Sequence, residues 1–286
     1  MRLLSTAPGI GDGLFIVQKL INAKEKFIIR IPNSYPQRGK SVWDLLPQVT
    51  ESAYYDNFRF REVRFRNHAA SHVFWKDIQD KEIFLEANTH VESGKRIEGF
   101  LPDLPTSFKL KFKIDVNQEN RALDLIYSLH SVSPLNKLIG IYCASYAGSR
   151  NWGTWGLDEW LQLVELMNEP DRTFVIIGAP YDDLTQELFQ KLLEKNIPAI
   201  NTVGEDLGTT IEVLKRLDMF IGFPSGLSIV NELCGAKKTF MFYSKAIKNI
   251  INTWGDPKRI ESGELKECLF CSPEQTFEWI KNNWTI

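Results

Sequence analysis

The chain has 286 residues, of which 43% are hydrophobic, 24% charged and 12% aromatic. These proportions exclude an intrinsically disordered chain, a collagen and a small disulfide-rich domain. Because 34 Lys and Arg nearly balance 36 Asp and Glu, no overall basic field attracts the chain to nucleic acid or to an anionic membrane.

Short apolar runs alternate with longer amphipathic ones, which is typical of βαβ units around a parallel sheet. In the first half this pattern predicts a strand at residues 2–6, a helix at 13–23 and a strand at 26–32. In the second half it predicts strands at residues 138–145, 173–180, 197–204, 218–223 and 239–244, alternating with helices at 157–167, 183–196, 208–217 and 225–235. A final helix is predicted at residues 272–284.

At about 150 residues for each domain, the length is consistent with two domains or with one large α/β domain. A polar, proline-containing segment at residues 131–137 separates the two halves and marks the expected hinge. We therefore expect an α/β protein with two Rossmann-like domains, residues 1–134 and 135–286.

The cysteines and the start of the chain bear on its location. We interpret the cysteines as free thiols of a reducing compartment; they are Cys143, Cys234, Cys268 and Cys271. The single Cys-x-x-Cys pair lacks the further ligands of a zinc site, so we expect no metal.

Residues 1–20 lack the apolar region of a signal peptide, and no apolar run approaches the roughly 20 residues that cross a bilayer. We expect a cytoplasmic protein without integral membrane contact.

The first strand-to-helix turn, residues 7–14, contains Gly9, Gly11 and Gly13, with Asp12 at the start of the helix. Ligands of open α/β sheets bind at such turns. Asp12 is interpreted either as a helix cap or as a general base at a domain cleft. The glycines do not form a GxGxxG fingerprint, and no acidic residue follows the next strand, so NAD binding is disfavoured.

Residues 145–156 hold Ser145, Arg150 and Trp152 between a strand and a helix. This turn carries more polar and aromatic groups than a connection requires. It is interpreted either as a ligand-binding loop or as a surface loop whose tryptophans cover the core.

The turn at residues 222–232 runs through Ser225, Gly226 and Leu227 directly into a helix. The free N–H groups at such a helix start can bind a diphosphate, whereas the alternative is simple capping by Ser225. Lys245, after the next strand, either neutralises charge at this site or is only solvated.

The glycine-rich turn with Asp12, together with the later Ser225-Gly226 turn, resembles glycosyltransferase family 9, the heptosyltransferase-like enzymes of GT-B fold. Residues 200–243 resemble the donor-binding core of that family, and residues 9–14 resemble the turn that carries its catalytic aspartate.

The sequence departs from the family pattern at several positions. Pro224 and Ile229 stand where the family usually has Asp and His, and its Lys-x-Trp-Pro segment is only echoed around Arg150 and Trp152. These departures put the identity of the donor in doubt. They also keep open a catalytically silent GT-B relative that binds a nucleotide or glycan.

The resemblance implies a GT-B fold, with a cleft between two Rossmann-like domains and a C-terminal helix. It implies a nucleotide-diphosphate sugar as co-substrate in the C-terminal domain, an acceptor in the N-terminal domain, and neither metal nor other cofactor. Asp12 would act as the general base of an inverting transfer. Glu205 and Glu232 are candidates for contacts to ribose hydroxyls, although both are equally consistent with exposed acids.

Two stretches of the first half are candidates for the acceptor site, beside Gly11 and Gly13. In residues 58–68, Arg61 and Arg64 alternate with phenylalanines, a pattern that fits phosphate and base contacts or a half-buried strand with solvated arginines. Residues 86–105 include Asn88 and His90 in a dense polar segment, interpreted as an acceptor loop or as a satisfied polar loop.

The acceptor class stays open between a glycan and a hydroxymethylated pyrimidine of DNA, because phage-type DNA glycosyltransferases are also GT-B enzymes. The arginine and phenylalanine stretch favours DNA, whereas the near-neutral charge disfavours it. A nucleotide-sugar epimerase with a dinucleotide cofactor is disfavoured by the incomplete glycine fingerprint.

Overall fold

The computed structural model describes residues 2–33, 39–55, 76–79, 82–85, 87, 90–91, 93–127, 136–143, 155–223, 225–243, 251–269 and 272–283. By packing, the chain divides into two units. The N-terminal unit comprises Met1–Lys113 and Asn249–Asp256, and the C-terminal unit comprises Ile114–Lys248 and Pro257–Ile286. Among the described residues, no helix combines the length and apolar character needed to span a bilayer.

The N-terminal unit contains a five-stranded sheet in the order β3-β2-β1-β5-β4. Strands β1, β2, β3 and β5 are parallel, whereas β4 runs antiparallel to β5. The elements are β1 (Arg2–Thr6), α1 (Ile10–Leu20), β2 (Phe27–Pro32), α2 (Lys40–Asp44), β3 (Val49–Tyr55), β4 (Lys76–Gln79), β5 (Glu82–Leu85) and the 3-10 helix η1 (Ile97–Gly99). The predicted strands at residues 2–6 and 26–32 are confirmed.

The first helix begins earlier than predicted. Gly9 has extended backbone, with φ −80 and ψ 145, and α1 starts at Ile10 rather than at Gly13. The Gly13 N–H already donates to the Gly9 carbonyl at 3.1 Å, so the glycines of the turn lie inside the first helical turn. The helix therefore brings Asp12 into its first turn.

A late segment completes the N-terminal unit. Helix α11 (Ile251–Trp254) packs against α1, with the rings of Phe15 and Trp254 6.3 Å apart. The Gln18 side chain donates from Nε2 to the Trp254 carbonyl at 3.0 Å, and Arg96 donates to the Asn252 carbonyl. Nothing in the local pattern of residues 251–254 indicates this contact, which the sequence analysis missed.

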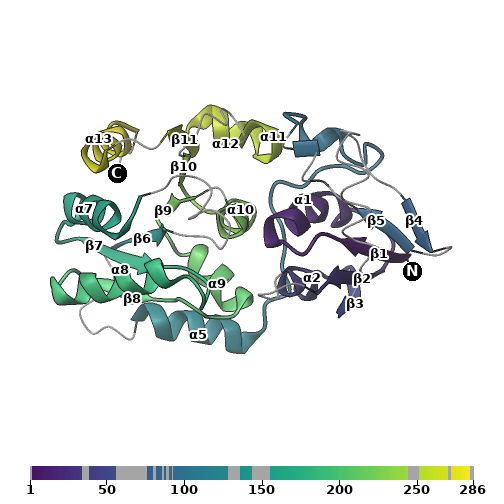
Figure 1. The fold of residues 1–286 in the computed structure, drawn as a ribbon, viewed down its shortest axis with the longest axis horizontal. Helices are drawn as coiled ribbons and strands as arrows, with labels where there is room; N and C mark the ends of the chain where they lie inside the picture. Colours follow the sequence, from purple (N-terminus) through teal and green to yellow (C-terminus); the bar gives the residue numbers. More distant parts are fainter. Residues whose placement is uncertain are drawn as a thin grey trace. The chain divides into compact units, whose positions relative to one another are not determined.

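The C-terminal unit contains a six-stranded parallel sheet in the order β11-β10-β9-β6-β7-β8 (Figure 1). Its strands are β6 (Lys137–Tyr142), β7 (Arg172–Ile176), β8 (Ala199–Asn201), β9 (Met219–Gly222), β10 (Thr239–Tyr243) and β11 (Leu265–Leu269). Its helices are α5 (Val116–Tyr127), α7 (Leu157–Met167), α8 (Asp183–Glu194), α9 (Leu207–Leu214), α10 (Gly226–Leu233), α12 (Pro257–Ser262) and α13 (Pro273–Asn283). The predicted doubly wound half is confirmed, with strand β11 and helix α12 added.

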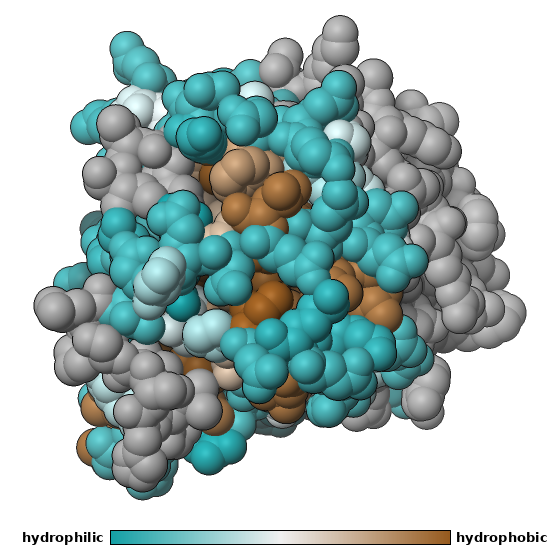
Figure 2. Space-filling view, turned by 90° about the vertical axis from the view of Figure 1, so that its left-hand side faces the viewer, coloured by the Kyte–Doolittle hydropathy of each residue, from teal (hydrophilic) through white to brown (hydrophobic). Residues whose placement is uncertain are grey.

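Side chains of the sheet alternate between its two faces, and one face carries a large apolar core. Ile139, Ile141 and Cys143 of β6 and its continuation are buried in this core together with Trp160 of α7 and Ile280 of α13. The outer surface at this end of the unit is mostly hydrophilic, with small separate apolar areas (Figure 2). This is the pattern of amphipathic helices that bury one face against a sheet.

The division between the units differs from the domain boundary predicted after residue 134. Helix α5 belongs to the C-terminal unit, because Gln118 donates to Asp206 at 2.6 Å and Arg121 donates to Glu205 at 2.6 Å. The change of unit falls at Lys113 and Ile114. The proline-containing segment at residues 131–137 lies after this helix, between α5 and β6.

Candidate functional site

The C-terminal sheet has one position where the direction of its connections reverses. Read from β8, the strand order is that of a doubly wound sheet numbered 3-2-1-4-5-6, and the reversal lies between β6 and β9. Ligands of such sheets bind beyond the carboxyl ends of these two strands. Tyr142 ends β6, Gly222 ends β9, and the two residues are register partners.

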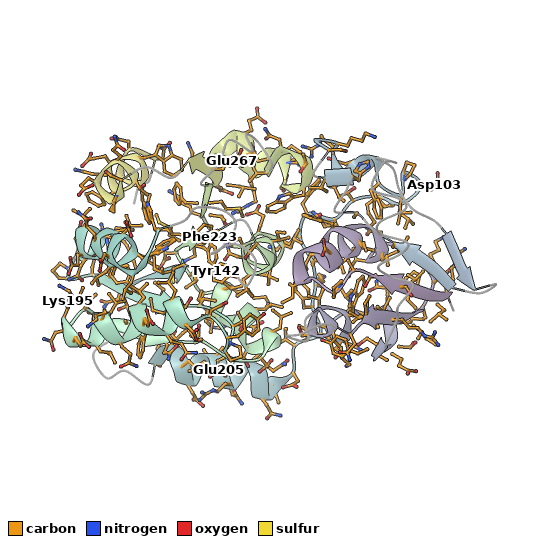
Figure 3. All side chains as sticks on the ribbon, viewed as in Figure 1. Asp103, Tyr142, Lys195, Glu205, Phe223 and Glu267 are labelled. Atoms are coloured by element: carbon orange, nitrogen blue, oxygen red, sulfur yellow. The ribbon has the colours of Figure 1, made fainter. Side chains whose placement is uncertain are left out.

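A glycine is required at the end of β9. A Cβ atom on Gly222 would lie 2.7 Å from the Tyr142 carbonyl oxygen and 2.9 Å from the Tyr142 Cβ, closer than atoms can approach. Phe223 follows directly and lies near Tyr142 in the centre of the unit (Figure 3). The close approach brings the start of α10 beside the end of β6.

The start of α10 carries free hydrogen-bond donors. Ser225 is the N-cap in extended backbone, with φ −131 and ψ −174, but its side chain makes no capping bond. Its Oγ atom is buried and has no hydrogen-bond partner among the residues that the structure describes. The Ser228 hydroxyl instead donates to the Phe223 carbonyl. Ser225 is therefore the N-cap residue of α10 without a capping bond from its side chain, and its contact to a ligand stays a prediction.

Two ionisable side chains, the carboxyl group of Asp182 and the thiol of Cys143, lie at the carboxyl edge of this sheet. Asp182, in the turn after β7, is 4% exposed and accepts a hydrogen bond from the Ala179 N–H at 2.8 Å. Burial raises its pKa to about 6, although the Ala179 N–H lowers it and Asp183 raises it further. Burial also raises the pKa of the Cys143 thiol to about 12, which keeps this side chain protonated.

Asp182 was missed by the sequence analysis. The only signal for it was its place just after the predicted strand at residues 173–180.

The N-terminal sheet has its own reversal point, between β1 and β5. The ends of these strands, Thr6 and Leu85, are register partners. Asp12 lies in the first turn of α1, directly beyond β1, and is half-buried. A Cβ on Gly9 would lie 2.5 Å from the Asp12 Oδ2 atom, so the carboxylate folds back over the helix start. The positive end of the helix dipole favours this negative charge.

The glycine and histidine predicted near Asp12 serve packing. Gly13 is buried, and its Cα faces the indole of Trp43, 3.4 Å from the place of a Cβ. His90 is 5% exposed, its Nε2 lies 2.8 Å from the Arg96 carbonyl, and its ring packs against Phe100. His90 is therefore packed inside the N-terminal unit, and its contact to an acceptor stays a prediction. Gly11 is half-exposed in the first turn of α1.

The comparisons with known proteins identify the fold. No family model and no curated protein matches the sequence. Among solved structures, ADP-heptose LPS heptosyltransferase II of E. coli is 13% identical, with a TM-score of 0.63 over 99% of this chain and 98% of that chain. A glycosyl transferase family 9 protein from Veillonella parvula is 15% identical, with a TM-score of 0.64 over 98% of this chain and 88% of that chain.

The E. coli heptosyltransferase WaaC, solved with ADP, is 15% identical, with a TM-score of 0.59 over 99% of this chain and 100% of that chain. The chain has the GT-B fold. The fold class predicted from the sequence is thereby confirmed, although all three identities are too low to show more than the fold.

Two acids predicted to contact a ribose in this GT-B chain are engaged elsewhere. Glu232 is 1% exposed and accepts from Arg259 Nε at 2.6 Å, beside Thr239 at the amino end of β10. It lies near the end of α10 opposite to Ser225 and forms an ion pair with Arg259, so its contact to the donor is not supported by this placement and stays a prediction. Glu205, near α5 (Figure 3), is held by Arg121 at 2.6 and 3.2 Å.

Other predicted residues of the GT-B site lie outside the described part of the chain. They are Ser145, Arg150, Trp152, Pro224, Lys245, Arg61, Arg64 and Asn88. Gly226 and Leu227 are described, half-exposed, in the first turn of α10. Within the described residues, no cluster of three or more His, Cys, Asp or Glu side chains is arranged to hold a metal ion.

Proposed function

We propose that the protein is a glycosyltransferase that moves a sugar from a nucleoside-diphosphate sugar to an acceptor hydroxyl. The observation that carries this proposal is the start of α10, where the free N–H groups of a helix of eight residues lie at the reversal point of the C-terminal sheet. The GT-B fold and the ADP bound by WaaC support a nucleotide ligand for this unit.

The proposed reaction breaks the bond between the anomeric carbon and the diphosphate, while the acceptor oxygen forms a new bond to that carbon. Negative charge then develops on the leaving diphosphate, where the N–H groups and positive dipole end of α10 stabilise it. In this proposal no metal ion is needed for that role. The attack of the acceptor from the opposite side inverts the configuration at the anomeric carbon.

Asp12 is the proposed general base, accepting the proton of the acceptor hydroxyl. It lies at the reversal point of the N-terminal sheet, which supports an acceptor site in that unit.

The acceptor is proposed as a glycan or a hydroxymethylated DNA base, with neither class favoured by the described residues. The cytoplasmic location expected from the sequence also stays a prediction. A silent nucleotide-binding relative is the competing function, motivated by Pro224 and Ile229 at positions where family 9 has Asp and His.

The experiment that tests the proposal is thermal unfolding and calorimetric titration with nucleoside diphosphates, nucleoside-diphosphate sugars and the matching monophosphates. We expect a diphosphate to raise the Tm and to bind more tightly than its monophosphate, because the helix start contacts the second phosphate. Any sugar nucleotide that binds is then incubated with glycan and hydroxymethylated DNA acceptors. Transfer supports the enzyme, binding without transfer or hydrolysis supports the silent relative, and no binding contradicts both.

A further inference from the structure

The turn that precedes α1 packs against a glycine from a distant part of the sequence. Gly39 is the N-cap of α2 and has φ +86, a left-handed backbone that glycine adopts at little steric cost. A Cβ atom on Gly39 would lie 2.8 Å from the Pro8 carbonyl oxygen and 3.5 Å from the Gly9 carbonyl oxygen. A larger residue at position 39 therefore has to displace the backbone of Pro8 and Gly9.

The same stretch of backbone borders the Asp12 carboxylate. Gly9 is the N-cap of α1, and its carbonyl accepts the Gly13 N–H at 3.1 Å. A Cβ atom on Gly9 would lie 2.5 Å from Asp12 Oδ2, so the carboxylate lies directly against the Gly9 backbone. Pro8 and Gly9 thus connect Gly39 to Asp12, and a shift of their backbone moves the surroundings of the carboxylate.

Helix α2 is held in place by its own packing. Trp43 is fully buried, and its indole packs against Gly13, 3.4 Å from the place of a Cβ. Asp44 accepts a hydrogen bond from the Ser52 hydroxyl of β3, which ties the end of α2 to the sheet. Because α2 is fixed at these points, we expect a side chain added at Gly39 to displace the turn before α1 rather than α2.

Proton transfer is sensitive to such a displacement, because the base has to lie within hydrogen-bond reach of the proton that it accepts. A misplacement of about 1 Å can lower a rate by about a hundredfold. The backbone around Asp12 therefore has to be held as precisely as the carboxylate itself.

We infer that Gly39 is a positioning residue of the proposed reaction. Through the backbone of Pro8 and Gly9 it holds the Asp12 carboxylate where that group accepts the acceptor proton. This inference rests on the proposed function, because it concerns the same base. It gives the start of α2 a role in transfer that no motif in the sequence indicated.

The test compares sugar transfer by Gly39→Ala with transfer by Gly94→Ala, a matched control in the same unit. Gly94 has a similar φ of +80, but no described atom lies within 4 Å of the place of its Cβ. Both substitutions strain a left-handed backbone, whereas only Gly39→Ala presses on Pro8. We expect Gly39→Ala to lower kcat by about tenfold to a hundredfold, while kcat of Gly94→Ala and the donor Kd of both variants stay within about twofold.

A second measurement repeats Gly39→Ala in the Asp12→Asn protein. Because the inferred role acts through the carboxylate, Gly39→Ala is expected to cause little further loss of transfer once Asp12 is replaced. A general loss of structure would instead lower transfer by the same factor in both backgrounds. The cycle therefore separates positioning of the base from an effect on folding.

A second variant, Gly39→Asn, keeps the test decisive if Gly39→Ala folds poorly. Asparagine adopts positive φ more readily than alanine but still carries a Cβ, so it lowers the backbone strain and keeps the contact with Pro8. We expect a Tm closer to that of the unmodified protein and a similar loss of kcat.

Three outcomes would count against the inference. Transfer by Gly39→Ala or Gly39→Asn at the rate of Gly94→Ala, or losses of Gly39→Ala and Asp12→Asn that multiply, would overturn it while the proposed function stands. Absence of sugar transfer by the unmodified protein with every acceptor overturns both.

Discussion

At the scale of single residues, Asp182 shows how burial changes a charge at the carboxyl edge of a sheet. Its carboxyl group lies near Tyr142 and Cys143, and its charge raises the pKa of both neighbours. Ionised Asp182 is compensated by the Ala179 N–H but by no cation that the described contacts show. The folded chain therefore favours the protonated form.

This arrangement makes stability depend on pH in a defined direction. The pKa of Asp182 is raised from 3.8 to about 6 in the folded chain, so the folded state binds the proton more tightly than the unfolded state. The stabilising contribution of this proton to the free energy of unfolding is fully present below pH 3.8 and is lost as the pH rises through about 6. As the pH rises from 4 to 7, we expect the free energy of unfolding of Asp182→Asn to increase by about 1–3 kcal/mol relative to that of the unmodified chain.

Urea unfolding at several pH values measures this difference. The matched comparison is Asp183→Asn at the neighbouring exposed position, for which a smaller gain of the same sign is expected because this substitution removes only the charge that raises the pKa of Asp182 further. A stability difference between Asp182→Asn and the unmodified chain that does not change with pH contradicts this account of Asp182.

Glu232 shows the limit of residue-level prediction. From sequence, an acidic residue near the end of an amphipathic helix is predicted to be exposed or to bind a ligand. The Glu232 side chain is instead buried against Arg259 of α12. The partner lies 27 residues later in the chain. Such a pair depends on tertiary packing, and removing one member of a buried ion pair is strongly destabilising. No local pattern could have distinguished it from a ribose contact.

At the scale of secondary structure, the start of α9 is set by one aspartate. The sequence predicted a helix at residues 208–217, but the N-cap is Asp206 and the helix spans Leu207–Leu214. The Asp206 carboxylate accepts hydrogen bonds from the backbone N–H groups of Gly208 and Thr209 and from Gln118 of α5. The Asp206 carboxylate thus caps the start of α9 and also bonds α5 to it through Gln118.

We expect Asp206→Ala to lower the free energy of unfolding by about 1–2 kcal/mol, the usual cost of losing an N-cap. Asp206→Asn keeps an acceptor oxygen and is the matched control, with a smaller loss. Burial alone would raise the pKa of Asp206, but hydrogen bonds from Thr209 and its other partners lower it. The benefit of Asp206 is therefore present above the unfolded pKa of 3.8 and is lost as the pH falls through the lower folded pKa.

Urea unfolding of both variants at neutral pH measures these losses. Equal free energies of unfolding for Asp206→Ala and the unmodified chain would contradict a stabilising role of this N-cap.

At the scale of the whole molecule, the alternation of apolar strands and amphipathic helices predicted the C-terminal sheet well. Each of its predicted strands exists, because parallel strands buried on both faces leave a clear apolar signature. The strand order and the positions of α5 and α11 could not be predicted in the same way. Both helices are placed by long-range contacts, Gln118 with Asp206 and Gln18 with Trp254.

The candidate site was predicted unevenly for the same reason. The starts of α1 and α10 are visible as glycine-containing turns after apolar strands, and the structure places both at reversal points of their sheets. The end of β6 lies beside the start of α10 only because β6 and β9 are neighbours, which the sequence does not show. The burial of His90 and Glu232 could not be predicted, because local polarity does not reveal which polar side chains become buried.

The central claim is that Asp12 takes the acceptor proton during sugar transfer, and the most direct test compares Asp12→Asn with the unmodified protein. Asparagine keeps the shape and the hydrogen-bonding position at the start of α1 but is a far weaker base. The account predicts that transfer falls by about 10²-fold or more while the Kd for the sugar nucleotide stays within about twofold. A variant that transfers sugar at the full rate, or that loses donor binding along with activity, would contradict it.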